Sequence, residues 1–177
     1  MFIQKHVTLL GPIWSHWTDI GLYRIALQQP DLPTPNATEL AKQSLRMVEK
    51  FDAQLVEFCR TGKETFDDVT VDPTGWTDFS RLVYKGCREI PPGKTLTYKQ
   101  LAKKAGNEKA SRAVGAAMAR NRILLVIPCH RVIASNGQLR GFSAPGGLAT
   151  KQSLLDLERQ GDHATAGELF ALSLIHI

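Results

Sequence analysis

The sequence contains few cysteines and no long apolar run, and both features exclude classes of protein. Cys59, Cys87 and Cys129 are too few and too scattered in 177 residues for a disulfide framework or a metal knuckle. No apolar stretch is long enough to span a bilayer, and no basic-then-apolar leader opens the chain. We therefore expect a cytoplasmic protein in a reducing compartment, with no metal and no membrane contact.

Acidic side chains are also scarce in one part of the chain. Residues 81–160 contain 15 Lys or Arg and four Asp or Glu, a net charge of +11, whereas the remainder contains seven and 13, a net charge of −6. A polyanion-binding face would produce this asymmetry, and so would a solvated surface with uneven charge. Charge alone leaves both interpretations open.

The N-terminal residues predict a small antiparallel sheet. Residues 7–10 and 21–27 are rich in β-branched and aliphatic side chains, and turn residues at 11–12 and 19–21 separate them. After a proline-rich connection at residues 30–35, the pattern changes from strand to helix.

A long helix is expected next, capped by Thr38 and ended by Gly62. Its apolar residues recur at helical spacing: Leu40, Val48, Phe51, Leu55 and Phe58. Acidic and turn-forming residues then continue to Gly75, where we place a domain boundary.

Three further helices are expected between residues 78 and 120. The first starts after Asp78 and stops at residues 91–93, a Pro-Pro-Gly sequence. Its core side should hold Phe79, Leu82, Val83, Cys87 and Ile90. Thr97 and Gln100 form a capping box for a short helix that Gly106 closes, and Asn107 can cap the next one. Two helices around a tight turn indicate helix-turn-helix or a plain helical hairpin.

The last of these helices has one nearly bare face. Its core side is expected to hold Ala110, Ala113, Val114, Ala117 and Met118. Arg112, Gly115, Ala116 and Ala119 share the other face. Such a face lets a helix backbone approach a groove while one long cation enters it, and it also suits plain helix packing.

The chemistry is expected at Cys129. Residues 123–127 form an apolar run that predicts a buried strand leading to Pro128 and Cys129. A nucleophilic cysteine needs a base, and His130 is adjacent; on an extended segment the two side chains point apart, so we expect one bridging water. Glu158 lies on the inward side of a last helix at 148–160 and can orient His130.

A turn at Asn136-Gly137 and a flexible loop at 141–147 lie between His130 and this last helix. Residues 162–177 form a tail without a clear pattern.

The string from Ile127 to Val132, Ile-Pro-Cys-His-Arg-Val, resembles the active-site signature of the O6-alkylguanine-DNA alkyltransferases, or methylated-DNA–protein-cysteine methyltransferases. The resemblance covers the whole second half, through Tyr98, residues 111–115, Asn121 and Glu158. It implies an α+β fold: a small antiparallel sheet with a helix in a ribonuclease H-like layout (1–75), then a mostly helical domain with a helix-turn-helix (76–161).

The same resemblance implies the activity and its residues. The Cys129 thiolate would take the alkyl group irreversibly from O6 of guanine, and from O4 of thymine, without a cofactor, in a monomer bound in the minor groove of duplex DNA. His130, Glu158 and Asn121 would support the cysteine. The expected DNA contacts are Arg112, Tyr98, Lys99, Asn107, Gly115 and Ser135. The base, flipped out of the duplex, would enter a pocket with Val132, Met118 and Ser143.

Two departures and three alternatives accompany this interpretation. Arg122 stands where the family often has proline, and the loop with Ser143 is two residues longer than the shortest family versions. An alkyltransferase-like damage-binding protein would lack Cys129. A cysteine hydrolase would need an oxyanion hole, and a thiol redox protein would need a nearby resolving cysteine.

Overall fold

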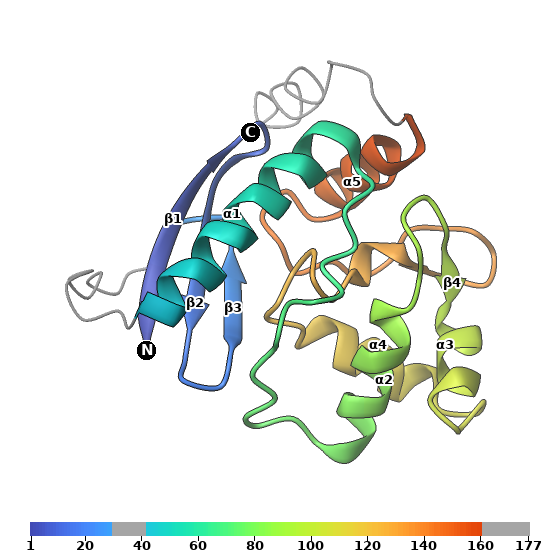
Figure 1. Ribbon diagram of the computed structural model, residues 1–177. Coiled ribbons are helices and arrows are strands. Elements are labelled where there is room, and N and C mark those ends of the chain that lie inside the picture. The colour runs from blue at the N-terminus through green and yellow to red at the C-terminus, as the bar shows by residue number, and fades with distance from the viewer. Residues whose placement is uncertain (30–41, 161–177) are drawn as a thin grey trace.

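The computed structural model of the chain describes residues 1–29 and 42–160. Its elements are β1 (Phe2–Thr8), β2 (Gly11–Trp17), β3 (Leu22–Ala26), α1 (Lys42–Thr61), α2 (Asp78–Arg88), β4 (Leu96–Thr97), α3 (Tyr98–Lys104), α4 (Ser111–Ala119), the 3₁₀ helix η2 (Cys129–Arg131), β5 (Val132–Ile133) and α5 (Leu148–Gln160). Figure 1 shows α1 lying across the three-stranded sheet, with α2, α3 and α4 on the other side of the molecule. The α+β fold class is confirmed; Thr38, Leu40 and the tail at 162–177 lie outside the described residues.

The N-terminal sheet is antiparallel, with the order β1-β2-β3. Its first turn lies earlier than predicted, because Thr8 pairs with Gly11 and the chain reverses at Leu9 and Leu10. The strand expected at residues 7–10 is therefore wrong at its C-terminal end, and the turn expected at 11–12 starts a strand. Gly11 has a φ of +90°, which only glycine adopts easily, so it can leave the turn and begin β2, in which Pro12 is the second residue.

The helix α1 packs against the sheet by the apolar residues that the periodicity predicted. Phe51, Leu55 and Phe58 are fully buried in the core. The helix ends where expected, at Gly62, whose N–H donates to the carbonyl of Phe58 at 2.7 Å. Gly62 has a φ of +67° and lies against the backbone of α5, where a Cβ would come within 2.7 Å of the Cα of Glu158. This contact fixes the end of α1 against the helix that carries Glu158.

We expect Gly62→Ala to destabilise the protein by about 3–5 kcal/mol, because it adds a backbone clash to an unfavourable positive φ. Gly106→Ala is the matched control, since Gly106 has a φ of +89° with nothing within 4 Å of its Cβ position. The control should cost only about 1–2 kcal/mol. Urea unfolding of both variants measures the difference. Equal losses would show that the contact between Gly62 and α5 does not contribute.

The helix α3 begins at its predicted cap, whereas α2 begins at Asp78, one residue earlier than predicted, and Thr77 caps it. Thr77 accepts a hydrogen bond from the N–H of Ser80 at the start of α2, and Thr97 and Gln100 form the predicted capping box of α3. Val83 and Cys87 are buried as expected, whereas Leu82 is 52% exposed. Leu82 was predicted to lie on the core side of α2. That prediction was wrong, because Leu82 lies outside the face of the helix that Val83 and Cys87 bury.

The helix α4 starts three residues later than predicted, with Ala110 in place of Asn107 at the N-cap position. Asn107 does not cap it; its side chain accepts from the N–H of Lys109, and its carbonyl accepts from the N–H of Ala110, which closes a separate turn. Val114, Ala117 and Met118 are buried as predicted. Ala113 was expected to be buried and is exposed, so the bare face is wider than the sequence indicated.

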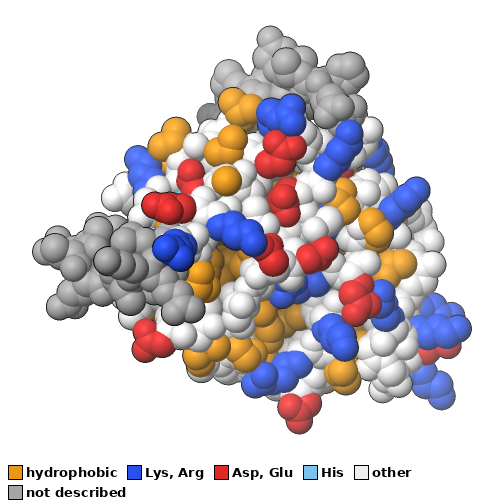
Figure 2. Space-filling model, viewed as in Figure 1, with side chains coloured by type: hydrophobic (Ala, Val, Ile, Leu, Met, Phe, Trp, Pro, Cys, Tyr) orange, Lys and Arg blue, Asp and Glu red, His pale blue; other side chains and the backbone are white. Residues whose placement is uncertain are grey.

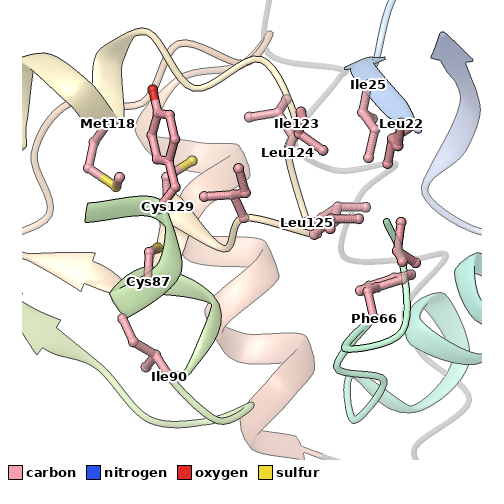
Figure 3. Close-up of a cluster of buried hydrophobic side chains, with 14 of the residues drawn as sticks. Leu22, Ile25, Phe66, Cys87, Ile90, Met118, Ile123, Leu124, Leu125 and Cys129 are labelled. Carbon is pink, nitrogen blue, oxygen red and sulfur yellow. The ribbon is translucent and has the colours of Figure 1, made fainter. Parts of the chain in front are cut away.

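One continuous hydrophobic cluster connects the sheet, α1, the C-terminal helices and the chain before Cys129. Figure 3 shows Leu125 between Leu22 and Ile25 of β3 and the side chain of Phe66. The domain boundary near Gly75 therefore stays a prediction. Among the described residues, no helix combines the length and the hydropathy that crossing a membrane requires.

Candidate active site around Cys129

The apolar run before Cys129 is buried, but it is a compact turn and not the predicted strand. The N–H of Val126 donates to the carbonyl of Leu124 at 2.8 Å, and that of Ile127 donates to Ile123 at 2.9 Å. Leu125 has a φ of +69°. When every side chain of a segment is buried, apolar and polar residues do not alternate along its sequence. The apolar pattern of residues 123–127 therefore could not distinguish a buried strand from a buried turn. The turn delivers Cys129 from within the core.

The Asn121 side chain holds this turn at both ends. Its amide nitrogen Nδ2 donates to the carbonyl of Ile127 at 2.8 Å, and its oxygen Oδ1 accepts from the N–H of Ile123 at 3.0 Å. Hydrogen bonding by the same side chain also lowers the pKa of the Cys129 thiol relative to the effect of burial alone. Asn121 therefore braces the backbone of the turn, as the resemblance implied for this position, and favours the thiolate of Cys129.

Cys129 opens the 3₁₀ helix η2 and is only 4% exposed. The extended segment expected for Cys129 and His130 is therefore wrong. Burial raises the pKa of the Cys129 thiol; the hydrogen bond from Asn121, the charge of Lys151 and the nearby backbone N–H groups oppose that rise without cancelling it. The thiol is therefore protonated at neutral pH, and a reaction at sulfur needs a base. Figure 3 shows Met118 and Cys87 beside it.

His130 and Glu158 form a buried pair. The Nε2 atom of His130 lies 2.7 Å from Oε1 of Glu158, and neither side chain is exposed. Burial lowers the pKa of His130, although Glu158 opposes this shift, so the imidazole is neutral at pH 7. A neutral ring that donates from Nε2 to Glu158 keeps Nδ1 as an acceptor. Among the described residues, Nδ1 has no hydrogen-bond partner.

Arg131 and Gly93 also bind Glu158, which the sequence did not indicate. The Nε and Nη2 atoms of Arg131 donate to Oε1 at 2.9 and 2.8 Å, and the N–H of Gly93 donates to Oε2 at 2.9 Å. Burial alone would raise the pKa of the Glu158 carboxyl, but the hydrogen bond from His130 and the contacts with Arg131 outweigh it, so that pKa is lowered. Glu158 is therefore ionised and joins η2 to the turn after α2.

Lys151 is a second buried cation that the sequence interpretation missed. Its Nζ donates to the carbonyl of Val132 at 2.6 Å and to that of Arg140 at 2.8 Å. Tyr98 also donates its hydroxyl to the carbonyl of Arg140, at 3.0 Å. The sequence could have predicted that Lys151 is buried, because positions 151, 154, 155 and 158 share one face of α5. The same helical spacing identified Glu158 as an inward-facing residue. Lys151 thereby fixes the loop after Val132 while its charge acts on Cys129.

The predicted DNA contacts meet in one cleft of about 460 Å³ beside α4. Five of the six expected residues line it: Tyr98, Lys99, Arg112, Gly115 and Ser135. Asn107 does not. Lys99 also pairs with Glu108 at 3.3 Å. Figure 2 shows Lys and Arg side chains gathered at the lower right of that view, where Figure 1 places α3.

The three residues expected to form the base pocket are not equally placed. Val132 and Met118 are buried near Cys129 in the common core. Ser143 is exposed and lines a different cavity, beside β3. The structure therefore does not bring Ser143 into the cleft that contains Tyr98.

Arg122, the departure from the family pattern, joins the site to the N-terminal half. Its guanidinium donates to the carbonyls of Tyr23, Asp72 and Thr74 at 2.8, 3.1 and 2.6 Å, and its carbonyl accepts from the N–H of Ile25 at 2.8 Å. The guanidinium carbon also lies 3.9 Å from the centroid of the Tyr23 ring. A proline could not make the side-chain contacts. Arg122 thus ties the turn before Cys129 to β3.

A serine, a histidine and an aspartate also meet in the N-terminal half, away from Cys129. The ring nitrogens of His6 lie 2.7 Å from Oδ1 of Asp52 and 2.7 Å from Oγ of Ser15. Ser15 is fully buried and also accepts from the indole of Trp17, so it offers no accessible nucleophile. Among the described residues, no group of three or more His, Cys, Asp or Glu could hold a metal ion.

Comparisons of the sequence with family models and with known proteins all point to one family. Residues 78–160 match the family model described as 6-O-methylguanine DNA methyltransferase, DNA binding domain. A methylated-DNA–protein-cysteine methyltransferase of Methanosarcina acetivorans is 40% identical over 156 residues, which cover 84% of this chain and 92% of the relative. One from Mycobacterium bovis is 36% identical over 148 residues, covering 84% and 73%.

A similar fold is found in a crystal structure of Mycobacterium tuberculosis OGT in complex with DNA. The TM-score is 0.69 at 27% identity, over 96% of this chain and 99% of that one. The O6-methylguanine methyltransferase from Pyrococcus kodakaraensis has a TM-score of 0.57 at 24% identity, covering 88% and 97%, and shares the fold. The chain belongs to the methylated-DNA–protein-cysteine methyltransferase family.

Proposed function

We propose that this protein repairs DNA by moving the alkyl group of O6-alkylguanine onto the sulfur of its own Cys129. The observation that carries the proposal is a buried cysteine followed by a neutral histidine that is itself hydrogen-bonded to a buried carboxylate. The family of the chain, the names of its relatives and the likeness to an OGT structure containing DNA support it.

The reaction assigns each group a role. Nδ1 of His130 takes the thiol proton, through water, while Glu158 orients the ring and stabilises the imidazolium. The thiolate attacks the alkyl carbon, the bond from that carbon to O6 breaks, and a proton returns to the guanine. Asn121 positions the sulfur. A thioether is not readily reversed, so each molecule acts once, and no cofactor takes part.

DNA binding is assigned to the cleft beside α4. The exposed, small-residue face of α4 enters the minor groove, Arg112 takes the place of the flipped nucleotide in the stack, and Tyr98 helps to rotate that nucleotide. Flipping costs a few kcal/mol and less for a poorly paired alkylated base, which favours damage. Residues 76–161 serve as the DNA-binding and alkyl-acceptor domain of a monomer, and O4-alkylthymine is a second substrate.

The carbonyls of Cys129 and Val132 accept from the guanine amino group in this proposal. The carbonyl of Val132 already accepts from Lys151, but a carbonyl oxygen has two lone pairs and can accept twice. A damage-binding protein without transfer is not favoured, because Cys129 is present and the similar proteins are named methyltransferases.

Intact mass measured after incubation with duplex DNA containing O6-methylguanine tests the proposal. We expect a gain of one methyl group, about 14 Da, located on Cys129. Cys129→Ala should gain nothing, whereas Cys59→Ala, which removes another buried thiol of the chain, should gain the full increment. An unchanged mass of the parent protein while it binds the DNA would refute the role of Cys129.

A further inference from the structure

A cavity of about 700 Å³ lies between β3 and the C-terminal end of α4. It is distinct from the cleft that contains Tyr98 and Arg112. Its polar lining includes His16 of β2, Arg24 of β3, Arg120 and Arg122 after α4, and Ser143 of the long loop. None of the described residues that line it is acidic. The lining is therefore complementary to an anion.

Two of the three arginines are available to a ligand. The guanidinium of Arg122 is bound to backbone carbonyls. Arg24 and Arg120 are exposed, and among the described residues neither side chain has a hydrogen bond or an ion pair. The exposed Arg159, by contrast, pairs with Asp156. Arginine forks bind phosphate oxygens in pairs, which makes two unpaired guanidiniums at one cavity a suitable phosphate site.

His16 is an independent indication of a ligand here. It lines the cavity, is 3% exposed, and its Nε2 atom has no hydrogen-bond partner among the described residues. A buried polar atom without a partner costs about 1–3 kcal/mol, so such atoms are rare outside sites where something binds. Burial and the charge of Arg24 lower the pKa of His16, so the ring is neutral and can donate a hydrogen bond without adding charge.

The position of the cavity relative to α4 identifies the anion. Arg112 lies in the first turn of α4 and lines the DNA cleft, whereas Arg120 follows its last residue and lines the cavity. Eight residues of helix separate them by about 12 Å. The minor groove is about 6 Å wide and is bordered by phosphates on both sides. A duplex that receives α4 therefore has phosphates near both ends of the helix.

We propose that this cavity binds a backbone phosphate of the DNA substrate through Arg24 and Arg120, with His16 as a neutral donor. The N-terminal sheet then contacts DNA directly, through Arg24. The inference rests on the proposed placement of α4 in the groove. It adds a phosphate contact from the half of the chain that carries a net negative charge.

The test is the salt dependence of binding to an undamaged duplex, followed by fluorescence anisotropy between 50 and 200 mM salt. Each lost phosphate contact lowers the slope of log K against log salt by about 0.9. Arg24→Gln and Arg120→Gln should each lose part of this slope, with a roughly five- to tenfold weaker Kd at 0.1 M salt, and the double variant, which leaves the one phosphate without a free arginine, should lose about 0.9. Arg24→Lys should keep most of the slope.

Arg46→Gln is the control, because Arg46 is an exposed cation on α1 outside both clefts. Thermal unfolding of Arg24→Gln should match the parent protein, which excludes misfolding. Unchanged slopes, an equal loss in Arg46→Gln, or a loss seen only with damaged DNA would overturn the phosphate site. A parent protein that gains no methyl group while the slopes change as expected would refute the alkyl-acceptor role and still support this site.

Discussion

Glu158→Gln is expected to slow alkyl transfer by about 100- to 1000-fold at neutral pH. The amide has the size of the carboxylate but cannot neutralise the charge of an imidazolium at His130. It can also donate to Nε2, which would place the His130 proton on Nδ1, the atom that must accept the thiol proton. Single-turnover transfer from an O6-methylguanine oligonucleotide measures the rate constant.

The same substitution should destabilise the fold by about 3–5 kcal/mol, because it leaves the buried Arg131 guanidinium without its counter-ion. Urea unfolding measures this loss. Asp156→Asn, also on α5, is the matched control, since its contacts with Gln152 and Arg159 are at the surface. It should change stability by less than about 1 kcal/mol and leave the rate unchanged. A transfer rate in Glu158→Gln within threefold of the parent would mean that Glu158 only holds the fold.

Much of the fold could be predicted because local chemistry and tertiary packing agree in those segments. The capping box of α3, the glycine end of α1 and the bounds of α5 follow from backbone groups that need partners near helix ends. The predictions for residues 123–127 and for the first turn were wrong. There the backbone conformation depends on distant partners, such as the β3 residues that pack around Leu125.

The candidate site was predictable in part for the same reason. The motif and the helical spacing identified Cys129, His130 and Glu158, which the structure places in one buried cluster. Lys151 shares the spacing of Glu158 and could have been found. The contacts of Arg122 with Tyr23 join residues 99 positions apart, and nothing in the local sequence encodes them.

Asn121→Asp is expected to slow alkyl transfer at neutral pH by about 10- to 100-fold and to move the rate profile to higher pH. The substitution keeps the acceptor for the N–H of Ile123 but removes the donor to Ile127 and to the Cys129 thiol. It also places a carboxylate beside the sulfur, which disfavours the thiolate.

The direction of the pH effect follows from the thiol. Burial already raises the Cys129 pKa, and the Asn121 hydrogen bond opposes that rise. Transfer needs the thiolate, so the rate increases as pH rises toward the thiol pKa. A variant with a still higher pKa must follow the same curve at a more alkaline position, losing about tenfold in rate for each unit of pKa.

Rate constants at saturating DNA between pH 6 and 10 separate two roles of Asn121. If it stabilises the thiolate, Asn121→Asp and the parent protein converge at high pH, where both sulfurs are ionised. Asn121→Ala, which loses the acceptor as well, should then combine a smaller pH shift with a greater loss of stability, because the N–H of Ile123 has no partner. A lower plateau with an unshifted profile would instead mean that Asn121 acts only through the geometry of the turn around Leu125.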